Sequence, residues 1–290
     1  MPAPRSLLHV PDPALAGCIV AAIERDTRGC ALSDAARCNF YPASPLVMLT
    51  WVFHGSLHLL TGDGEREPFQ PGPALPAITL TGPQRRPLVS WSPGDIHAFS
   101  VGLYPEVLAH WLGEPLDGYM DRTVALDEMP LPALQSACTA VQACGGAAPF
   151  DVLQQVFTGL YREEGGAAAP VPLLGDWLRS MATRAAHSGS GRGLRQLQRR
   201  IRDWTGQSQR DLALFERVEA AFHLREALAD QGEGGLAAVA AEAGFADQSH
   251  MGRAVRRVTG LSPARFSERL ATDEAFWYYR LVADFRRPAR

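Results

Sequence analysis

Residues 236–266, LAAVAAEAGFADQSHMGRAVRRVTGLSPARF, decide the fold of the C-terminal part of this chain. Their first apolar residues have helical spacing, and Gly244 follows where a left-handed residue can end a helix at little steric cost. Asp247 stands where an N-cap is needed, because its carboxylate can accept the free backbone N–H groups of a second helix. Gly260 ends that helix, and Ser262 caps a third. The stretch therefore predicts a helix-turn-helix.

The second predicted helix has one apolar and one polar face. Met251, Val255 and Val258 form a stripe that can pack against the first helix. The polar face suits a DNA major groove, where an amide can read adenine, an arginine can read guanine and further arginines can bind phosphates. A surface helix of this kind also occurs in domains that bind no DNA, so the pattern alone leaves both interpretations open. The polar face carries Gln248, Ser249, His250, Arg253, Arg256 and Arg257, with the last two suited to phosphates.

Two stretches resemble the AraC family of transcriptional regulators. Residues 244–266 match its Gly-Phe, Asp, Ser-His, Arg, basic pair, Thr-Gly and Ser-Pro signature, and residues 194–212 (LRQLQRRIRDWTGQSQRDL) resemble its first helix-turn-helix. The predicted domain that holds them, residues 170–271, spans about 100 residues, near a third of the chain. The resemblance implies two helix-turn-helix units joined by a long helix at about 208–230. The base-reading residues that it implies are Arg195, Gln198 and Arg199 in the first unit, and Gln248, Ser249, His250 and Arg253 in the second.

The entry to the first unit departs from the family pattern. Gly193 stands where the family usually has a capping serine, and the preceding loop, residues 187–192, is rich in glycine. Glycine is a tolerable cap, and Ser190 can substitute for the missing serine. We therefore expect a first unit that is more mobile or less sequence-specific than the second.

The N-terminal half has short runs of β-branched and aromatic residues separated by turn sequences, which is typical of a small antiparallel barrel or sandwich. In the AraC family such a domain is often cupin-like and senses a small molecule or forms a dimer. The predicted fold class is therefore α+β, with a β-rich N-terminal barrel or sandwich followed by an all-α domain with two helix-turn-helix units. The expected strands are 46–53, 56–60, 77–81, 88–91 and 97–103.

Composition divides the chain into parts. Small residues closed by a proline at 165–170 (GGAAAP) predict an interdomain linker. The predicted parts are a β-rich effector or dimerisation domain (1–125), a helical connector and linker (126–169), a DNA-binding domain (170–271) and an aromatic-rich C-terminal helix or tail (272–290). Helices are expected at 105–111, 173–187, 193–204, 208–230, 236–243, 247–258, 263–271 and 273–282.

The distribution of charge supports a polyanionic partner for the second half alone. The whole chain has a formal charge of −3. Residues 1–169 hold 9 Arg against 17 Asp and Glu, whereas residues 170–290 hold 19 Arg against 14. The acidic front and basic back predict that only the helical half approaches DNA.

The sequence offers no constellation for catalysis. The five cysteines lack metal-binding spacing, and His54 and His58 have no third ligand at a convincing distance in the sequence. Phosphate loops, nucleophile elbows and dinucleotide turns are absent from the sequence. We therefore expect no enzyme activity, no catalytic residue, no cofactor and no bound metal. The N-terminus does not resemble a signal peptide and no apolar run reaches membrane-spanning length, so a cytoplasmic protein without membrane contact is expected.

Some roles stay open at this level. Arg85 and Arg86 either clamp an anionic effector or lie on a solvated turn. The aromatic segment 273–282 either docks on the chain itself, forms a dimer contact or covers the N-terminal domain. The expected partners are double-stranded DNA, a small-molecule effector, a second copy of the chain and RNA polymerase. The alternative function is a cupin-like small-molecule binding protein or enzyme with a helical appendage.

Overall fold

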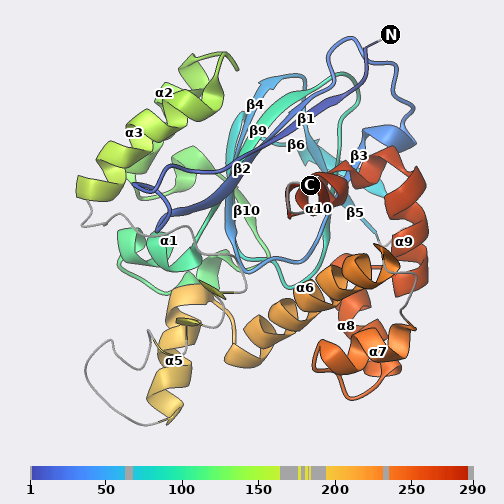
Figure 1. Ribbon diagram of the computed structural model, residues 1–290. Coiled ribbons are helices and arrows are strands. Elements are labelled where there is room, and N and C mark those ends of the chain that lie inside the picture. The colour runs from blue at the N-terminus through green and yellow to red at the C-terminus, as the bar shows by residue number, and fades with distance from the viewer. Residues whose placement is uncertain are drawn as a thin grey trace.

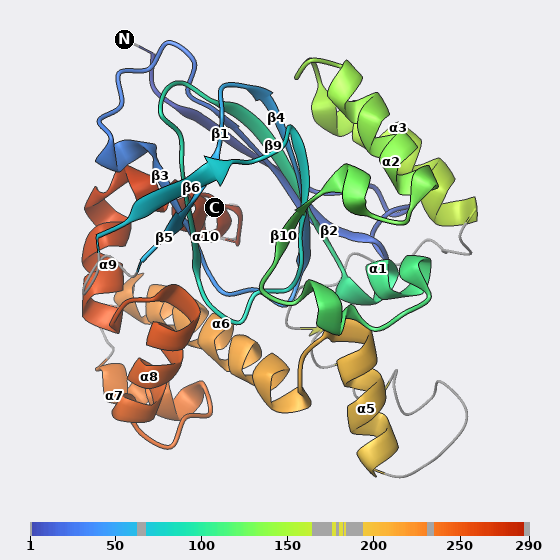
Figure 2. The same ribbon diagram turned by 180° about the vertical axis from the view of Figure 1, so that it is seen from behind.

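The computed structural model describes residues 2–62, 68–163, 176, 177, 180, 181, 183, 194–230 and 235–286. Two antiparallel sheets form its N-terminal part, and helices form its C-terminal part (Figures 1 and 2). This arrangement confirms the α+β prediction. The proposed linker at 165–170 and the glycine-rich entry at 187–193 lie outside the described residues.

All strand pairs are antiparallel. The larger sheet has the order β1 (Arg5–His9), β2 (Ile19–Asp26), β9 (His97–Leu103), β4 (Val47–His54), β7 (Ile78–Thr81) and β10 (Thr123–Ala125). The smaller sheet has the order β3 (Cys38–Tyr41), β8 (Leu88–Trp91), β5 (His58–Thr61) and β6 (Gln70–Ala74). Within the described ranges no named strand of one sheet pairs with a strand of the other. The N-terminal part is therefore a sandwich and not a closed barrel.

The sequence analysis found five of these strands and missed β1, β2, β3, β6 and β10. Strand β2, IVAAIERD, ends in charged residues that rarely occur in a strand, and β6 contains Pro71 and Pro73. Proline is tolerated in β6 because this strand lies at a sheet edge and pairs only with β5. Tertiary pairing overrides local preference in both strands.

The six-stranded sheet has two different faces. In β4, Val47, Leu49 and Trp51 are fully buried, whereas Met48 and Thr50 point to the opposite face and line a cavity between the sheets. This alternation follows from the two-residue period of a strand. The continuous hydrophobic core therefore lies on the face of the larger sheet that points away from the smaller sheet. The space between the two sheets holds a cavity.

Three helices cover the core face of the larger sheet (Figure 2). They are α1 (Pro105–Leu112), α2 (Pro132–Ala143) and α3 (Pro149–Glu163). The Trp51 indole Nε1–H donates a hydrogen bond of 2.9 Å to the carbonyl of Cys138 in α2. Leu153 and Phe157 of α3 belong to the same buried cluster. Short 3-10 turns at Ala35–Arg37, Leu116–Tyr119 and Leu126–Glu128 complete the N-terminal half.

The C-terminal half contains α5 (Leu194–Thr205), α6 (Gln209–Asp230), α7 (Leu236–Glu242), α8 (Gln248–Thr259) and α9 (Pro263–Thr272). A 3-10 turn, η4 (Glu274–Phe276), and α10 (Trp277–Arg286) follow them. The described helices include none whose length and apolar content match a bilayer crossing.

The aromatic C-terminal segment, η4 and α10, docks on the sandwich (Figure 1). Trp277 is 4% exposed, and its indole Nε1–H donates a hydrogen bond of 2.7 Å to the buried Asn39 Oδ1. Phe276 stacks on Phe40 with ring centroids 4.9 Å apart. The segment therefore packs on the chain's own body and covers part of the N-terminal domain, which fits the first and the third of the three alternatives for these residues.

The two faces of β4 make different contributions to stability. We expect Leu49→Ala to lower the free energy of unfolding by about 3 kcal/mol, because it leaves a void in the packed core. Thr50→Ala, on the cavity face of the same strand, loses one hydrogen bond to Ser100 and should cost about 1 kcal/mol. Urea unfolding of both variants measures the difference. Equal losses would contradict the assignment of the core to the outer face.

Candidate nucleic-acid interface

Local sequence fixes both ends of α8. The Asp247 carboxylate accepts a hydrogen bond of 2.6 Å from the His250 backbone N–H, as an N-cap does. Gly244 and Gly260 have φ of 76° and 81°, which is the left-handed region that favours glycine. The Gly260 N–H donates to the Arg256 carbonyl and ends the helix. The turn, cap and stop predicted from the sequence are therefore confirmed.

The two faces of α8 divide as the sequence predicts. Met251, Val255 and Val258 are at most 5% exposed and pack toward α6 and α7. The His250 ring makes an edge contact with Phe245 at 5.4 Å, which holds it near the turn. The remaining polar residues point to solvent: Gln248, Ser249, Arg253, Arg256 and Arg257 are exposed.

Helix α5 repeats this division. Ile201 is fully buried, and Leu197 and Trp204 pack against the same core. The three predicted base-reading residues, Arg195, Gln198 and Arg199, are exposed on the opposite side. The structure thus brings the predicted residues of each unit together on one helix face.

The two units end in the same hydrogen-bonding device, 54 residues apart (Thr205 and Thr259). The Thr205 hydroxyl donates to the Ile201 carbonyl at 2.6 Å and accepts from the Gln207 N–H at 3.1 Å. Thr259 makes the equivalent bonds at 2.9 Å and 3.2 Å. A left-handed glycine and a capping serine follow each threonine, at Gly206 and Ser208 and again at Gly260 and Ser262. This Thr-Gly-x-Ser repeat is a sequence signal for the first unit that our motif analysis did not use.

Both units dock on the sandwich and its helices. At the end of α8 the Val258 carbonyl accepts a hydrogen bond of 2.8 Å from the Ala43 N–H, and Gly260 lies against Pro87. At the end of α5, Gly206 lies so close to Met120 that a Cβ there would be 2.3 Å from the sulfur. The N-terminal half therefore sets the relative positions of the two exposed faces.

Comparison with known proteins bears on this architecture. Residues 190–269 match a family model described as a helix-turn-helix domain, and the match includes α5 of the first unit and the second unit up to Arg269. This part of the chain is therefore a helix-turn-helix domain. The helix-turn-helix predicted from residues 236–266 is confirmed.

Whole-chain comparisons are more distant than the match to the helix-turn-helix domain. A search of curated proteins gives no match. Among solved structures, one crystal form of ToxT from Vibrio cholerae is 10% identical, with coverage of 91% of this chain and 98% of that chain and a TM-score of 0.39. ToxT from Vibrio cholerae O395 is 11% identical, with coverage of 91% and 96% and a TM-score of 0.36. At these identities and scores, assignment of the helix-turn-helix domain rests on the family match.

Within the helix-turn-helix domain, Arg257 makes an ion pair that the sequence analysis did not anticipate. Its Nη2 lies 2.5 Å from Oδ1 of Asp211, at the start of α6. Burial raises the pKa of the Asp211 carboxyl, but hydrogen bonds from Ser208 and Arg257 outweigh it, so the pKa lies below its usual range. Arg257 therefore joins α8 to α6. Its side chain stays 47% exposed to solvent.

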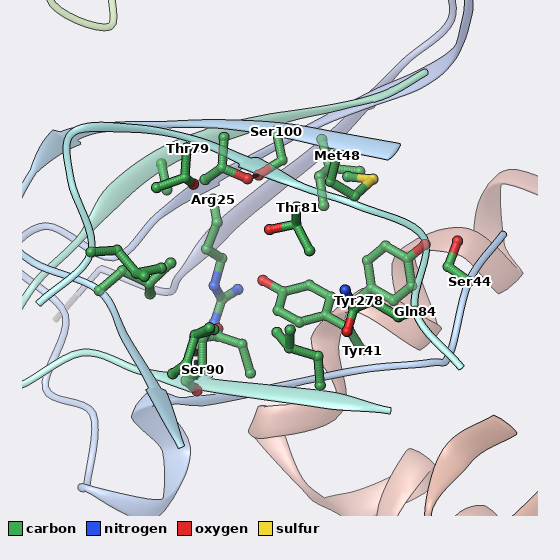
Figure 3. Close-up of a pocket in the computed structure, with 18 of the residues that line it drawn as sticks. Arg25, Tyr41, Ser44, Met48, Thr79, Thr81, Gln84, Ser90, Ser100 and Tyr278 are labelled. Atoms are coloured by element: carbon green, nitrogen blue, oxygen red, sulfur yellow. Dashed lines mark hydrogen bonds between the residues drawn. The ribbon is translucent and has the colours of Figure 1, made fainter. Parts of the chain in front are cut away.

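A second candidate site is the cavity of about 120 Å³ between the sheets (Figure 3). The one formally charged residue among its described lining is Arg25, on β2. Arg85 and Arg86 are exposed and do not line this cavity, and Arg85 is paired with Asp121. Arg25 was not predicted from the sequence because β2 was not predicted as a strand, in which a charged residue among apolar ones is a signal for a buried charge.

The two histidines of the sequence, His54 and His58, lie at the end of β4 and the start of β5. His58 Nδ1 lies 2.9 Å from the Gly72 carbonyl oxygen, and His54 is exposed. Within the part of the chain that the structure describes, no three His, Cys, Asp or Glu side chains gather as metal ligands do.

The cap of α8 is open to a direct test. We expect Asp247→Ala to lower the free energy of unfolding by about 1 kcal/mol, because the first-turn N–H groups of α8 lose their acceptor. Asp247→Asn keeps an oxygen at the same place and should restore most of the loss. Urea unfolding followed by circular dichroism measures both. Equal destabilisation by the two variants would show that the carboxylate does not act as a cap.

The Asp211–Arg257 pair predicts a pH dependence. A depressed pKa in the folded state means that the carboxylate stabilises the fold above the unfolded value, about 3.9, and that this contribution is lost as the pH falls through the folded value. The stability difference between wild type and Asp211→Asn should therefore stay constant above about pH 5 and shrink below about pH 4. Asp117→Asn, at an exposed position, is the control. A difference that does not change with pH would contradict the pairing.

Proposed function

We propose that this protein is a sequence-specific DNA-binding regulator of transcription and that a small-molecule effector controls it through the N-terminal sandwich. The observation that carries the proposal is the outer face of α8, where an amide and arginines are exposed on a helix held by its apolar back. A major groove admits such a helix. The charge excess of the second half supplies attraction to the phosphates.

The residues of the two units have separate roles in this proposal. Gln248 and Arg253 contact base edges near the start and middle of α8, with Ser249 and His250 beside them. Arg256 contacts a phosphate, and Arg257 does so from its pair with Asp211. Arg195, Gln198 and Arg199 have the base-reading role on α5. Phosphate contacts position a helix, whereas base contacts specify the sequence.

The effector part of the proposal rests on the cavity in the sandwich. A ligand there changes DNA binding only if it binds the DNA-competent and incompetent arrangements with different affinity. The docking of both units on the sandwich gives the N-terminal half a physical route to such a difference. Homodimer formation and contact with RNA polymerase stay predictions.

Fluorescence anisotropy with DNA from the region upstream of the protein's own gene tests the proposal. Wild type should prefer that DNA over random sequence, and its affinity should fall steeply with salt. Arg253→Ala should reduce the preference roughly tenfold or more, because one bidentate base contact is lost. Arg256→Ala should weaken binding to both DNAs by similar factors, since a phosphate contact carries no sequence information.

Arg86→Ala serves as the matched control, because Arg86 is an exposed arginine on the sandwich. It removes the same charge and should leave both affinities unchanged. Equal binding of wild type to all sequences would refute specific regulation and favour the alternative, a small-molecule binding protein or enzyme with a helical appendage.

A further inference from the structure

The cavity in the sandwich is apolar with one buried charge. Leucines, methionine and small hydroxyl residues form most of its wall, and Figure 3 shows Arg25 reaching between Thr79 and Ser90. At about 120 Å³ it is close in size to cavities that hold one benzene-sized molecule, roughly 150 Å³. This lining suits a small organic molecule with an apolar body and a single anionic group.

The Arg25 guanidinium is almost fully enclosed, and its side chain is 7% exposed. It donates to Ser6 Oγ at 2.7 Å and to Glu274 Oε1 at 2.6 Å, while its buried Nε has no hydrogen-bond partner within the described residues. A buried charge that loses its counter-ion is strongly unfavourable. An acceptor must therefore stay at Arg25 whenever Glu274 leaves.

Glu274 comes from the C-terminal segment, 249 positions away in the sequence. Its other oxygen, Oε2, lies 3.1 Å from Arg280 Nη2 within the same segment. If the Glu274 carboxylate leaves Arg25, it still has its ion pair with the Arg280 guanidinium. The carboxylate can thus move away from the sandwich without becoming an unpaired charge.

The same segment closes the cavity and contacts the helix-turn-helix domain. Tyr278 forms part of the cavity wall, and the Trp277 ring lies 4.9 Å from the Arg25 guanidinium carbon. On the other side of the segment, the Tyr279 ring packs against the Phe266 ring of α9, with centroids 4.9 Å apart. Helix α9 directly follows the recognition helix α8 in the chain.

We propose that Glu274 pairs with Arg25 in place of a ligand, and that a small organic carboxylate in the cavity binds Arg25 in its stead and releases the C-terminal segment. This inference rests on the proposed effector site and assigns its ligand class and its regulation. Docking of the segment and binding of the carboxylate are mutually exclusive at Arg25. The ligand therefore acts on α9, and through α9 on α8, by freeing the segment that packs on α9.

Benzoate is a suitable probe, and benzamide is its neutral counterpart of the same shape. Isothermal titration calorimetry should show that full-length wild type binds benzoate and not benzamide. Glu274→Gln should bind benzoate roughly tenfold more tightly, because the competing charge is gone. Arg25→Gln should not bind it. Hydrogen exchange of residues 274–286 should speed up when benzoate is added to wild type.

Asp273→Asn is the matched control. It removes a neighbouring carboxylate, which pairs with Arg269 and not with Arg25, and it leaves the Arg25–Glu274 pair in place. Its benzoate affinity should equal that of wild type. If Asp273→Asn tightens benzoate binding as much as Glu274→Gln, the loss of a nearby negative charge and not the release of Arg25 is the cause, and the proposal is wrong. Equal binding of benzamide, or no benzoate binding by wild type and Glu274→Gln, also overturns it.

These measurements contain no DNA. A failure of specific DNA binding leaves the benzoate result standing, and a failure of benzoate binding leaves the base-reading role of α8 untouched. Because Arg25→Gln removes a buried charge and can disturb folding, the comparison of Glu274→Gln with Asp273→Asn decides the outcome.

Discussion

The buried guanidinium of Arg25 is the constraint on which the relation between the two halves depends. An arginine inside a sandwich needs a counter-ion, and the nearest carboxylate in this fold comes from the far end of the chain, at Glu274. Satisfying that charge places η4 and α10 at the mouth of the sandwich. Trp277 then packs over the guanidinium and donates a hydrogen bond to Asn39, so these polar contacts hold the start of α10 on the sandwich.

The larger sheet makes this arrangement possible because its two faces have different tasks. One face, with Leu49 and Trp51, packs under α1, α2 and α3 and supplies the stable core. The other, with Met48 and Thr50, is left free to line a cavity. Because the core lies between the larger sheet and the three helices, a cavity between the two sheets does not remove the packing that stabilises the larger sheet.

The helix-turn-helix domain shows how a repeated local device produces two similar units. The Thr205 and Thr259 hydroxyls each donate to the carbonyl four residues earlier and accept from the backbone N–H two residues later, and each threonine precedes a left-handed glycine. The units differ in what they dock against: the first meets Met120, and the second meets Ala43 and Pro87. Their common internal geometry is local, whereas their relative position is imposed by the sandwich.

The sequence by itself determined the second unit almost completely. Gly244, Asp247 and Gly260 act through φ preference and capping, which depend on a few neighbouring residues, so the turn, the helix and its exposed face could be predicted. It also predicted the β-rich half, but not β2 and β6, because long-range pairing made strands of residues with poor β preference. Only the tertiary structure brought Arg25 to Glu274 and paired Arg257 with Asp211. Such contacts join residues far apart in the chain, and no local pattern records which distant partner a charge will meet.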